Sequence, residues 1–216
     1  KVEARNFDIR KTLIKFDNVL NDQRQVIFTQ RNEVINSKEI FSYSDSFLSE
    51  ILEQIKKLKS KEIATSKKTE FSKQLKSLLG KSFNEIEFND LLKEKNEELE
   101  SKIKKKFLKI RSERIKELSE AQAAELEKRI FLQTIDLNWK THIQYLEQLR
   151  QVIGLRSYGQ RDPLIEYKKE AFDLFENLLF KLKKDLITIL INLTIENKIK
   201  ESTTSTIEPA KINPKY

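Results

Sequence analysis

Glycine and proline are almost absent from this sequence, and their few positions constrain the fold more than any other feature. The 216 residues contain three glycines and three prolines. None of them precedes Gly80, and Gly154, Gly159 and Pro163 lie close together, so the strongest interruption of the folded part is the stretch 154–163. β-sandwiches and Rossmann-type sheets need many tight turns. The sequence therefore predicts an all-α fold made of long helices.

The composition narrows the chemistry that the chain can perform. Hydrophobic residues make up 38% and charged residues 35%, which favours rods and thin bundles over a thick core. The absence of cysteine excludes disulfides and thiolate metal sites, and a single histidine leaves little for zinc or triad chemistry. No glycine-rich phosphate loop is present. We therefore predict no catalytic, cofactor-binding or metal-binding residue in this chain.

The ends and the hydropathy suggest how the chain relates to a larger protein. It contains no methionine at all, not even an initiator, so we expect it to be part of a longer polypeptide. No apolar run approaches the roughly 18 residues of a membrane span. The charged residues near the start are not those of a signal peptide.

The first 35 residues carry the clearest helical periodicity. Residues 2–35 predict one helix roughly 50 Å long at about 1.5 Å per residue, which needs partners along its length. Gln23 and Gln30 lie in register with its apolar stripe, so we expect this stripe to face a mixed surface rather than a dry core. The stripe consists of Ile9, Leu13, Phe16, Leu20, Ile27 and Val34.

Residues 118–195 predict a long antiparallel helical hairpin. Two amphipathic helices over 121–153 and 164–194 flank the loop 154–163, and Asp162-Pro163 is a good helix start. His142 lies in register with the first stripe and is interpreted as a packing or hydrogen-bonding histidine. Trp139 is interpreted as a core anchor. The two stripes are Leu132, Ile135, Trp139, Leu146, Leu149 and Ile153, then Ala171, Phe175, Leu178, Leu182, Leu186, Ile189 and Leu193.

The middle segment, residues 36–117, differs from both flanks. It opens with a serine-rich patch and predicts short helices at 47–58, 71–79 and 88–118. It holds 20 basic and 15 acidic residues, which is most of the net charge of +8. A solvated lysine-rich face is the plain interpretation, and binding of anionic lipid or nucleic acid is the alternative. Residues 196–216 predict a flexible linker.

The hairpin loop is the strongest candidate for a contact site. Arg150, Arg156 and Arg161 surround Tyr158 at the end of a stiff rod. Either these residues are an ordinary helix–helix turn, or they form a tip that touches a partner or a polypeptide.

Two blocks of residues closely resemble the SecA family of bacterial protein-export motors. Residues 1–11, Phe16-Asp17-Asn18-Val19 and Asn21-Asp22-Gln23-Arg24 resemble the start of its helical scaffold domain. The second block resembles its two-helix finger, and the poorly matched segment between the blocks corresponds in position to its helical wing domain. The second block comprises 132–136, Trp139-Lys140, His142, 149–151, 155–163 and 166–168.

The resemblance implies a division into scaffold helix 1–35, wing 36–117, finger 118–195 and linker 196–216. It implies that the finger tip contacts a channel and a sliding polypeptide, and that the chain couples and restrains an ATPase whose ATP and Mg²⁺ bind elsewhere in the parent protein. The implied contact residues are Arg156, Ser157, Tyr158, Gly159, Gln160, Arg161 and Asp162.

The implied partners are the nucleotide-binding folds of the parent, the SecYEG channel, unfolded preprotein, anionic membrane lipid and a second copy of the protein. The implied location is the bacterial cytoplasm and the cytoplasmic face of the inner membrane. The alternative from another class is a stand-alone helical coiled-coil protein that binds anionic lipid or nucleic acid through its lysines.

Overall fold

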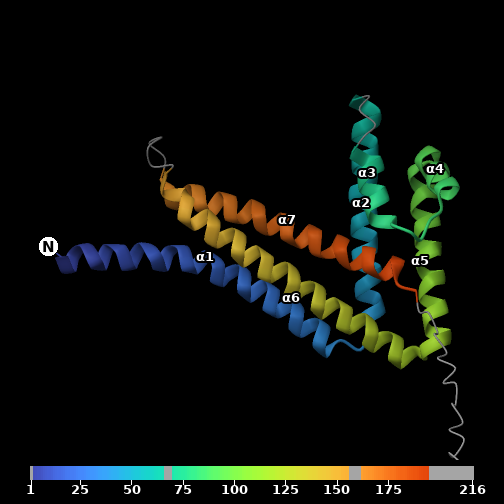
Figure 1. Cartoon of the computed structure of the whole chain (residues 1–216), viewed down its shortest axis with the longest axis horizontal. Coiled ribbons are helices and arrows are strands. Elements are labelled where there is room, and N and C mark those ends of the chain that lie inside the picture. Colours follow the sequence, from blue (N-terminus) through green and yellow to red (C-terminus); the bar gives the residue numbers. More distant parts are fainter. Residues whose placement is uncertain (1, 66–69, 156–161, 195–216) are drawn as a thin grey trace, which may run out of the picture.

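A computed structural model describes residues 2–65, 70–155 and 162–194, and the all-α fold is confirmed over this part of the chain (Figure 1). These residues form seven α-helices and no strand. The seven helices are α1 (Val2–Asn36), α2 (Ile40–Thr65), α3 (Glu70–Leu79), α4 (Glu85–Lys93), α5 (Asn96–Leu118), α6 (Glu120–Ile153) and α7 (Pro163–Asn192).

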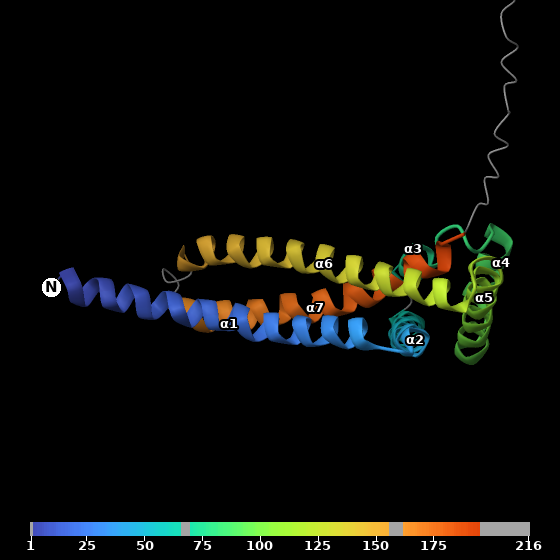
Figure 2. The same cartoon turned by 90° about the horizontal axis from the view of Figure 1, so that it is seen from below.

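The three longest helices, α1, α6 and α7, run along one another and form the scaffold. Helices α6 and α7 make the expected antiparallel hairpin, and α1 packs along both (Figures 1 and 2). Toward the tip of the hairpin, the rings of Phe16 and Tyr167 pack in a T-shaped arrangement with a centroid distance of 4.8 Å. This end has its own small core, formed by Phe16, Leu146, Leu149, Ile153, Tyr167 and Ala171.

The amino-terminal part of α1 departs from the expected buried stripe. Among the side chains that the structure describes, Phe16 is the first buried one along the helix, whereas Leu13 is 39% exposed and Ile14 is 58% exposed. In both views this part of α1 extends beyond the hairpin (Figures 1 and 2). The apolar periodicity is therefore real, but no other helix in the described part of the chain covers it.

Helices α2 to α5 form a unit that we call the wing. Its helices cross the scaffold at a steep angle, as the end-on view of α2 shows (Figure 2). The serine-rich patch is not a break, because α2 begins at Ile40 instead of residue 47. Ser44 and Ser49 donate their hydroxyls to the carbonyls of Ile40 and Asp45 four residues earlier, so these side chains are satisfied within the helix.

The single helix expected over 88–118 is in fact two helices. Asn84 starts α4 with a capping box, since its side chain accepts from Glu87 N at 2.8 Å and the Glu87 carboxylate accepts from Asn84 N at 3.1 Å. The chain is extended at Glu94 and Lys95, between α4 and α5. A Gly- or Pro-based search misses this break because neither residue occurs there.

The wing and the inner half of the scaffold share one hydrophobic core. Because α2 and α3 pack against the carboxyl end of α7, the buried face of α7 broadens there. Ile189, expected to be buried, is 41% exposed, and Ile187, Leu190 and Ile191 are buried in its place. The most enclosed residues of this core include Leu52, Leu75, Leu78, Leu99, Ile103, Phe107, Phe131, Leu186, Ile187 and Leu190.

A single residue joins the wing to the hairpin. Ser119 lies between α5 and α6, with φ 79° and ψ 158°, a region that glycine alone enters easily. Its N–H donates to Ile115 O and its carbonyl accepts from Ala123 N, so the two helices meet without a loop. Such a backbone conformation costs about 1–3 kcal/mol and persists only where the surroundings impose it.

Candidate functional site

The tip of the hairpin is only partly described. Arg156, Ser157, Tyr158, Gly159, Gln160 and Arg161 lie outside the described residues, so their proposed contacts stay a prediction. Asp162 is described: its carboxylate accepts from Leu164 N at 2.8 Å and caps α7, with Pro163 in the first turn. The expected helix start is thus confirmed, and Asp162 has a structural task there.

Arg150, which the sequence analysis placed beside the tip, contacts α1. Its Nη1 lies 3.1 Å from Asp17 Oδ1 of α1. This ion pair connects the last turn of α6 to the scaffold helix. Arg150 therefore links the end of α6 to α1.

A buried polar contact joins the three scaffold helices at mid-length. Gln23 Nε2 of α1 donates to the backbone carbonyl of Ala171 on α7 at 2.9 Å, and Gln23 Oε1 lies 2.8 Å from His142 Nε2 of α6. Because the amide oxygen can only accept, this arrangement assigns the proton of neutral His142 to Nε2. The interpretation of His142 as a hydrogen-bonding residue is confirmed, as is the mixed surface expected around Gln23.

The surroundings of His142 are mostly apolar. Its ring lies 5.5 Å from the Trp139 ring and 5.8 Å from the Phe175 ring, between centroids. Burial lowers the pKa of His142 to about 4, from an ordinary value of 6.5. A shallow hollow of about 110 Å³ between α6 and α7 opens beside it, and Tyr145 and Lys181 line its rim. Trp139 is half-buried and packs against the main core.

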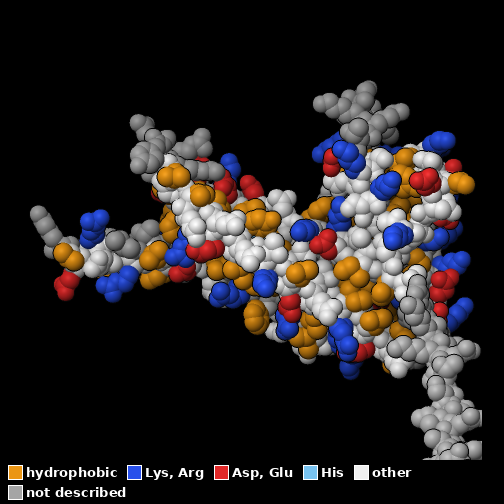
Figure 3. Space-filling view, viewed as in Figure 1, with side chains coloured by type: hydrophobic (Ala, Val, Ile, Leu, Met, Phe, Trp, Pro, Cys, Tyr) orange, Lys and Arg blue, Asp and Glu red, His pale blue; other side chains and the backbone are white. Residues whose placement is uncertain are grey.

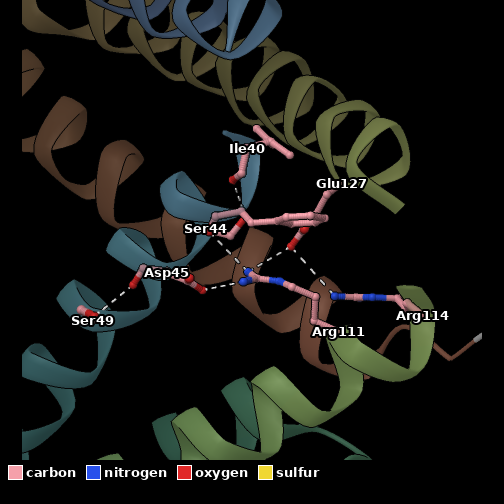
Figure 4. Close-up of polar contacts among 8 residues, drawn as sticks. Ile40, Ser44, Asp45, Ser49, Arg111, Arg114 and Glu127 are labelled. Atoms are coloured by element: carbon pink, nitrogen blue, oxygen red, sulfur yellow. Dashed lines mark hydrogen bonds and ion pairs between the residues drawn. The ribbon is translucent and has the colours of Figure 1, made fainter. Parts of the chain in front are cut away.

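A second buried polar group lies where the wing meets the hairpin (Figure 4). Glu127 of α6 is 2% exposed, and its Oε1 lies 3.4 Å from Arg111 Nη2 and 3.9 Å from Arg114 Nη2 on α5. Arg111 Nη1 also binds Asp45 Oδ1 of α2 at 2.8 Å, and Arg114 Nη1 donates to Leu190 O of α7 at 2.7 Å. These contacts join four helices.

The electrostatics of this cluster are costly. Burial raises the pKa of Glu127, while the guanidinium groups of Arg111 and Arg114 act in the opposite direction. Burial also lowers the pKa of Arg114. Within the described residues Arg111 Nε, Arg114 Nη2 and Glu127 Oε2 form no hydrogen bond. Arg111 compensates in part by lying over the rings of Phe41 and Phe107, at 4.9 Å and 4.8 Å.

Glu127 was not singled out in the sequence analysis, and its burial was not predicted. The helical spacing of the buried residues in α5 and α6 could have indicated it. Glu127 continues the buried stripe of Ala123, Ile130 and Thr134, and Arg111 and Arg114 continue the stripe of Leu99, Ile103 and Phe107. A charged residue in register with an apolar stripe is buried and needs a partner of opposite charge.

The carboxyl end of α7 is completed by the wing. Asn192 Oδ1 accepts from Lys81 N at 2.8 Å and Ser82 N at 3.2 Å, and the Ser82 hydroxyl donates to Ile191 O. Together with Arg114 on Leu190 O, these groups satisfy carbonyls that a helix end leaves without partners. The last turn of α7 therefore belongs to the junction with the wing.

Basic and acidic side chains both lie on the face of the wing that Figure 3 shows, and several wing lysines face acidic partners. Lys56 and Lys104 pair with Glu100, Lys102 pairs with Glu94, and Lys106 pairs with Glu87 at 3.5 Å. A hollow between α4 and α5 is lined by lysines, but Glu87 and Asp90 line it as well. Its basic residues are Lys102, Lys105, Lys106 and Lys109.

The described residues contain neither a metal-binding cluster nor a membrane-spanning helix. Over 2–65, 70–155 and 162–194 no group of His, Asp and Glu side chains has a geometry suited to a metal ion. No helix in the same ranges is long and apolar enough to cross a membrane.

The arrangement defines a class: an all-α scaffold made of a long helix and a long hairpin, with a helical unit inserted between them. Comparison with known proteins gives the family. The SecA wing and scaffold domain matches residues 1–194, and the chain belongs to this family.

Two curated relatives carry the same name. Protein translocase subunit SecA from Pelagibacter ubique (strain HTCC1062) is 66% identical over 202 residues, which cover 94% of this chain and 24% of the relative. Protein translocase subunit SecA from Bartonella bacilliformis is 38% identical over 207 residues, which cover 94% and 23%. The chain thus spans about a quarter of the length of these relatives, and the resemblance inferred from the sequence is confirmed.

Proposed function

We propose that this chain is the wing and scaffold part of a protein translocase subunit, and that it couples ATP hydrolysis to the movement of unfolded preprotein through the SecYEG channel. ATP and Mg²⁺ bind to nucleotide-binding folds outside this chain. The scaffold also restrains the ATPase when no preprotein is bound. The observation that supports this function most is the family match across residues 1–194.

The geometry of the hairpin suits the transmission of force. Helices α6 and α7 pack along their length, and α1 is fixed to both by Gln23 and His142 and to α6 by Arg150. Packed helices move as units, so a displacement at the base of the hairpin reaches its tip. The tip residues, Arg156 to Asp162, contact the channel and the sliding polypeptide.

The proposed setting follows from the same function. The parent protein works in the bacterial cytoplasm and at the cytoplasmic face of the inner membrane, where it meets SecYEG and anionic lipid. The uncovered part of α1 is the surface that faces the nucleotide-binding folds or a second copy of the protein. Its exposed residues include Phe7 and Ile14.

A crosslinking experiment tests the position of the tip. The chain has no cysteine, so a single Tyr158→Cys substitution can be placed in the intact parent after its own cysteines are replaced. We expect crosslinks to the channel and to a stalled preprotein, with a yield that changes on addition of ATP. The matched control is Lys140→Cys, an exposed residue far along α6 that should crosslink to neither. Absence of both crosslinks in a protein that still translocates would contradict the proposal.

The alternative function is binding of anionic lipid or nucleic acid through the lysines. In the described part of the wing six lysines face carboxylates: Lys56, Lys57, Lys102, Lys104, Lys106 and Lys109. Exposed ion pairs of this kind contribute little stability, so displacing them costs a phosphate ligand little. Tight and strongly salt-dependent binding of RNA or anionic vesicles by this chain alone would favour the alternative.

A further inference from the structure

The junction between wing and hairpin combines two unusual features. The chain turns from α5 into α6 at one residue, Ser119, whose backbone lies in a region normally reserved for glycine. The buried cluster spans this corner, because Arg111 and Arg114 lie before it and Glu127 after it. Side chains on both sides of the corner are thus bound to one another.

The apolar core across the junction does not by itself specify an angle. Hydrophobic contacts are non-directional, and cores tolerate rearrangement as long as volume is conserved. The ion pairs and hydrogen bonds of the cluster are directional. Arg111 binds Asp45 on α2 and Glu127 on α6, and Arg114 binds Leu190 O on α7. These contacts form only when the helices concerned have the right relative positions.

Burial makes the cluster a poor source of stability and a good source of specificity. Replacing buried ion pairs by apolar residues often leaves a protein as stable or more stable. Here several polar atoms of Arg111, Arg114 and Glu127 also stay without a hydrogen bond among the described residues. Stability therefore does not explain why these charged residues are present in the core. Buried charges can instead serve to fix a unique orientation of the parts that they join.

We propose that Arg111, Arg114 and Glu127 are positioning residues that set one fixed angle between the wing and the hairpin at the Ser119 corner. Without them the wing rests on the same apolar core at several angles. The angle depends on contacts within this chain, so it holds whatever the tip of the hairpin touches.

Distances between spin labels on the two sides of the corner test this proposal. Lys105 on α5 and Gln144 on α6 are exposed, and each is replaced by cysteine in the intact parent without its own cysteines. A second pair, Gln144 and Asp173, lies within the hairpin and reports general loosening. The parent sequence should give one narrow distribution for both pairs.

Glu127→Gln removes the charge and keeps the shape of the side chain. We expect it to widen the distribution between positions 105 and 144 by about twofold or to add a second distance, and to leave the hairpin pair unchanged. The matched control Lys102→Gln removes an exposed ion pair within the wing and should change neither distribution.

A triple variant, with Arg111, Arg114 and Glu127 each changed to Met, separates orientation from stability. We expect it to stay helical, because the three substitutions roughly conserve the volume of the core. We expect the same widening, because the directional ion pairs and hydrogen bonds are lost. If Glu127→Gln does not fold, the triple variant decides alone. Narrow distributions in the folded variants would overturn the proposal, and so would equal widening within the hairpin.

Discussion

The only histidine of the chain makes the pH dependence of its stability easy to interpret. His142 is neutral and buried in the folded state, with a pKa of about 4, and regains its ordinary pKa near 6.5 on unfolding. A group with a depressed folded pKa contributes stability that is complete above the unfolded value and is lost as the pH falls toward the folded value.

We therefore expect the free energy of unfolding to be constant above about pH 7 and to fall by up to about 3 kcal/mol between pH 6.5 and 4 through His142 alone. Urea unfolding followed by circular dichroism at several pH values measures this. In His142→Gln this fall between pH 6.5 and 5 should disappear. Glu127, whose pKa is raised by burial, contributes with the opposite sign, because a carboxyl group that binds its proton more tightly in the folded state gains stability as the pH falls. An unchanged slope in this variant would contradict the assignment.

Residue-scale prediction from the sequence succeeded where a residue obeyed the pattern of its helix. His142 lies in register with an apolar stripe, and its polar partner, Gln23, lies in register with another. Glu127 obeys the same rule, but its burial was not predicted, because a charged residue usually faces solvent. A buried charge also requires a buried partner of opposite charge. For Glu127 of α6 this partner is Arg111 of α5.

At the scale of elements, the ends of α3 and α7 depend on one another. Gly80 follows α3 with φ +55°, and a Cβ placed there would lie 2.6 Å from Asn192 Oδ1 at the end of α7. The same Asn192 oxygen accepts from Lys81 and Ser82. Only a residue without a side chain permits this approach.

Gly80→Ala should accordingly lower the free energy of unfolding by about 2 kcal/mol, from the left-handed backbone and the displaced Asn192 together. Thermal unfolding measures the loss. Gly154→Ala is the matched control, because Gly154 has ordinary helical angles and an added methyl group would meet nothing within 4 Å, so it should be neutral or slightly stabilising. Equal effects of the two changes would refute this account.

The long helices were predictable because apolar residues recur at helical spacing over about thirty residues, which no strand or loop would produce. The hairpin followed from Gly154 and Pro163, and its second helix starts as Asp162-Pro163 indicates. The wing was less predictable. Ser44 and Ser49 imitate a loop but bond to their own helix, and α4 separates from α5 without glycine or proline. These local choices depend on contacts that a single stretch of sequence does not contain.

At the scale of the whole molecule, α1 carries an uncovered apolar stripe. Phe7, Ile14, Phe28 and Ile35 recur at steps of seven or fourteen residues and are 40–62% exposed. Such spacing places them along one side of a helix. Apolar stripes of this length on a soluble surface usually mark an interface.

We expect the isolated chain to self-associate through this stripe, with an average mass that rises with concentration. Sedimentation velocity over a hundredfold concentration range measures it. The double change Phe7→Gln and Ile14→Gln should return the chain to a monomer, whereas Lys11→Gln, on an exposed residue of the same helix, should not. A monomer at all concentrations in the unaltered chain would show that the stripe is not adhesive by itself.

The completion of α7 by the wing has a consequence for the order in which the molecule folds. The carbonyls of Leu190 and Ile191 are satisfied by Arg114 and Ser82, residues made long before them during synthesis. The last turn of α7 therefore gains these hydrogen bonds only after the wing has folded. We expect the amide protons of this turn to exchange with solvent faster when the wing is open, so their protection reports whether the inserted unit has folded.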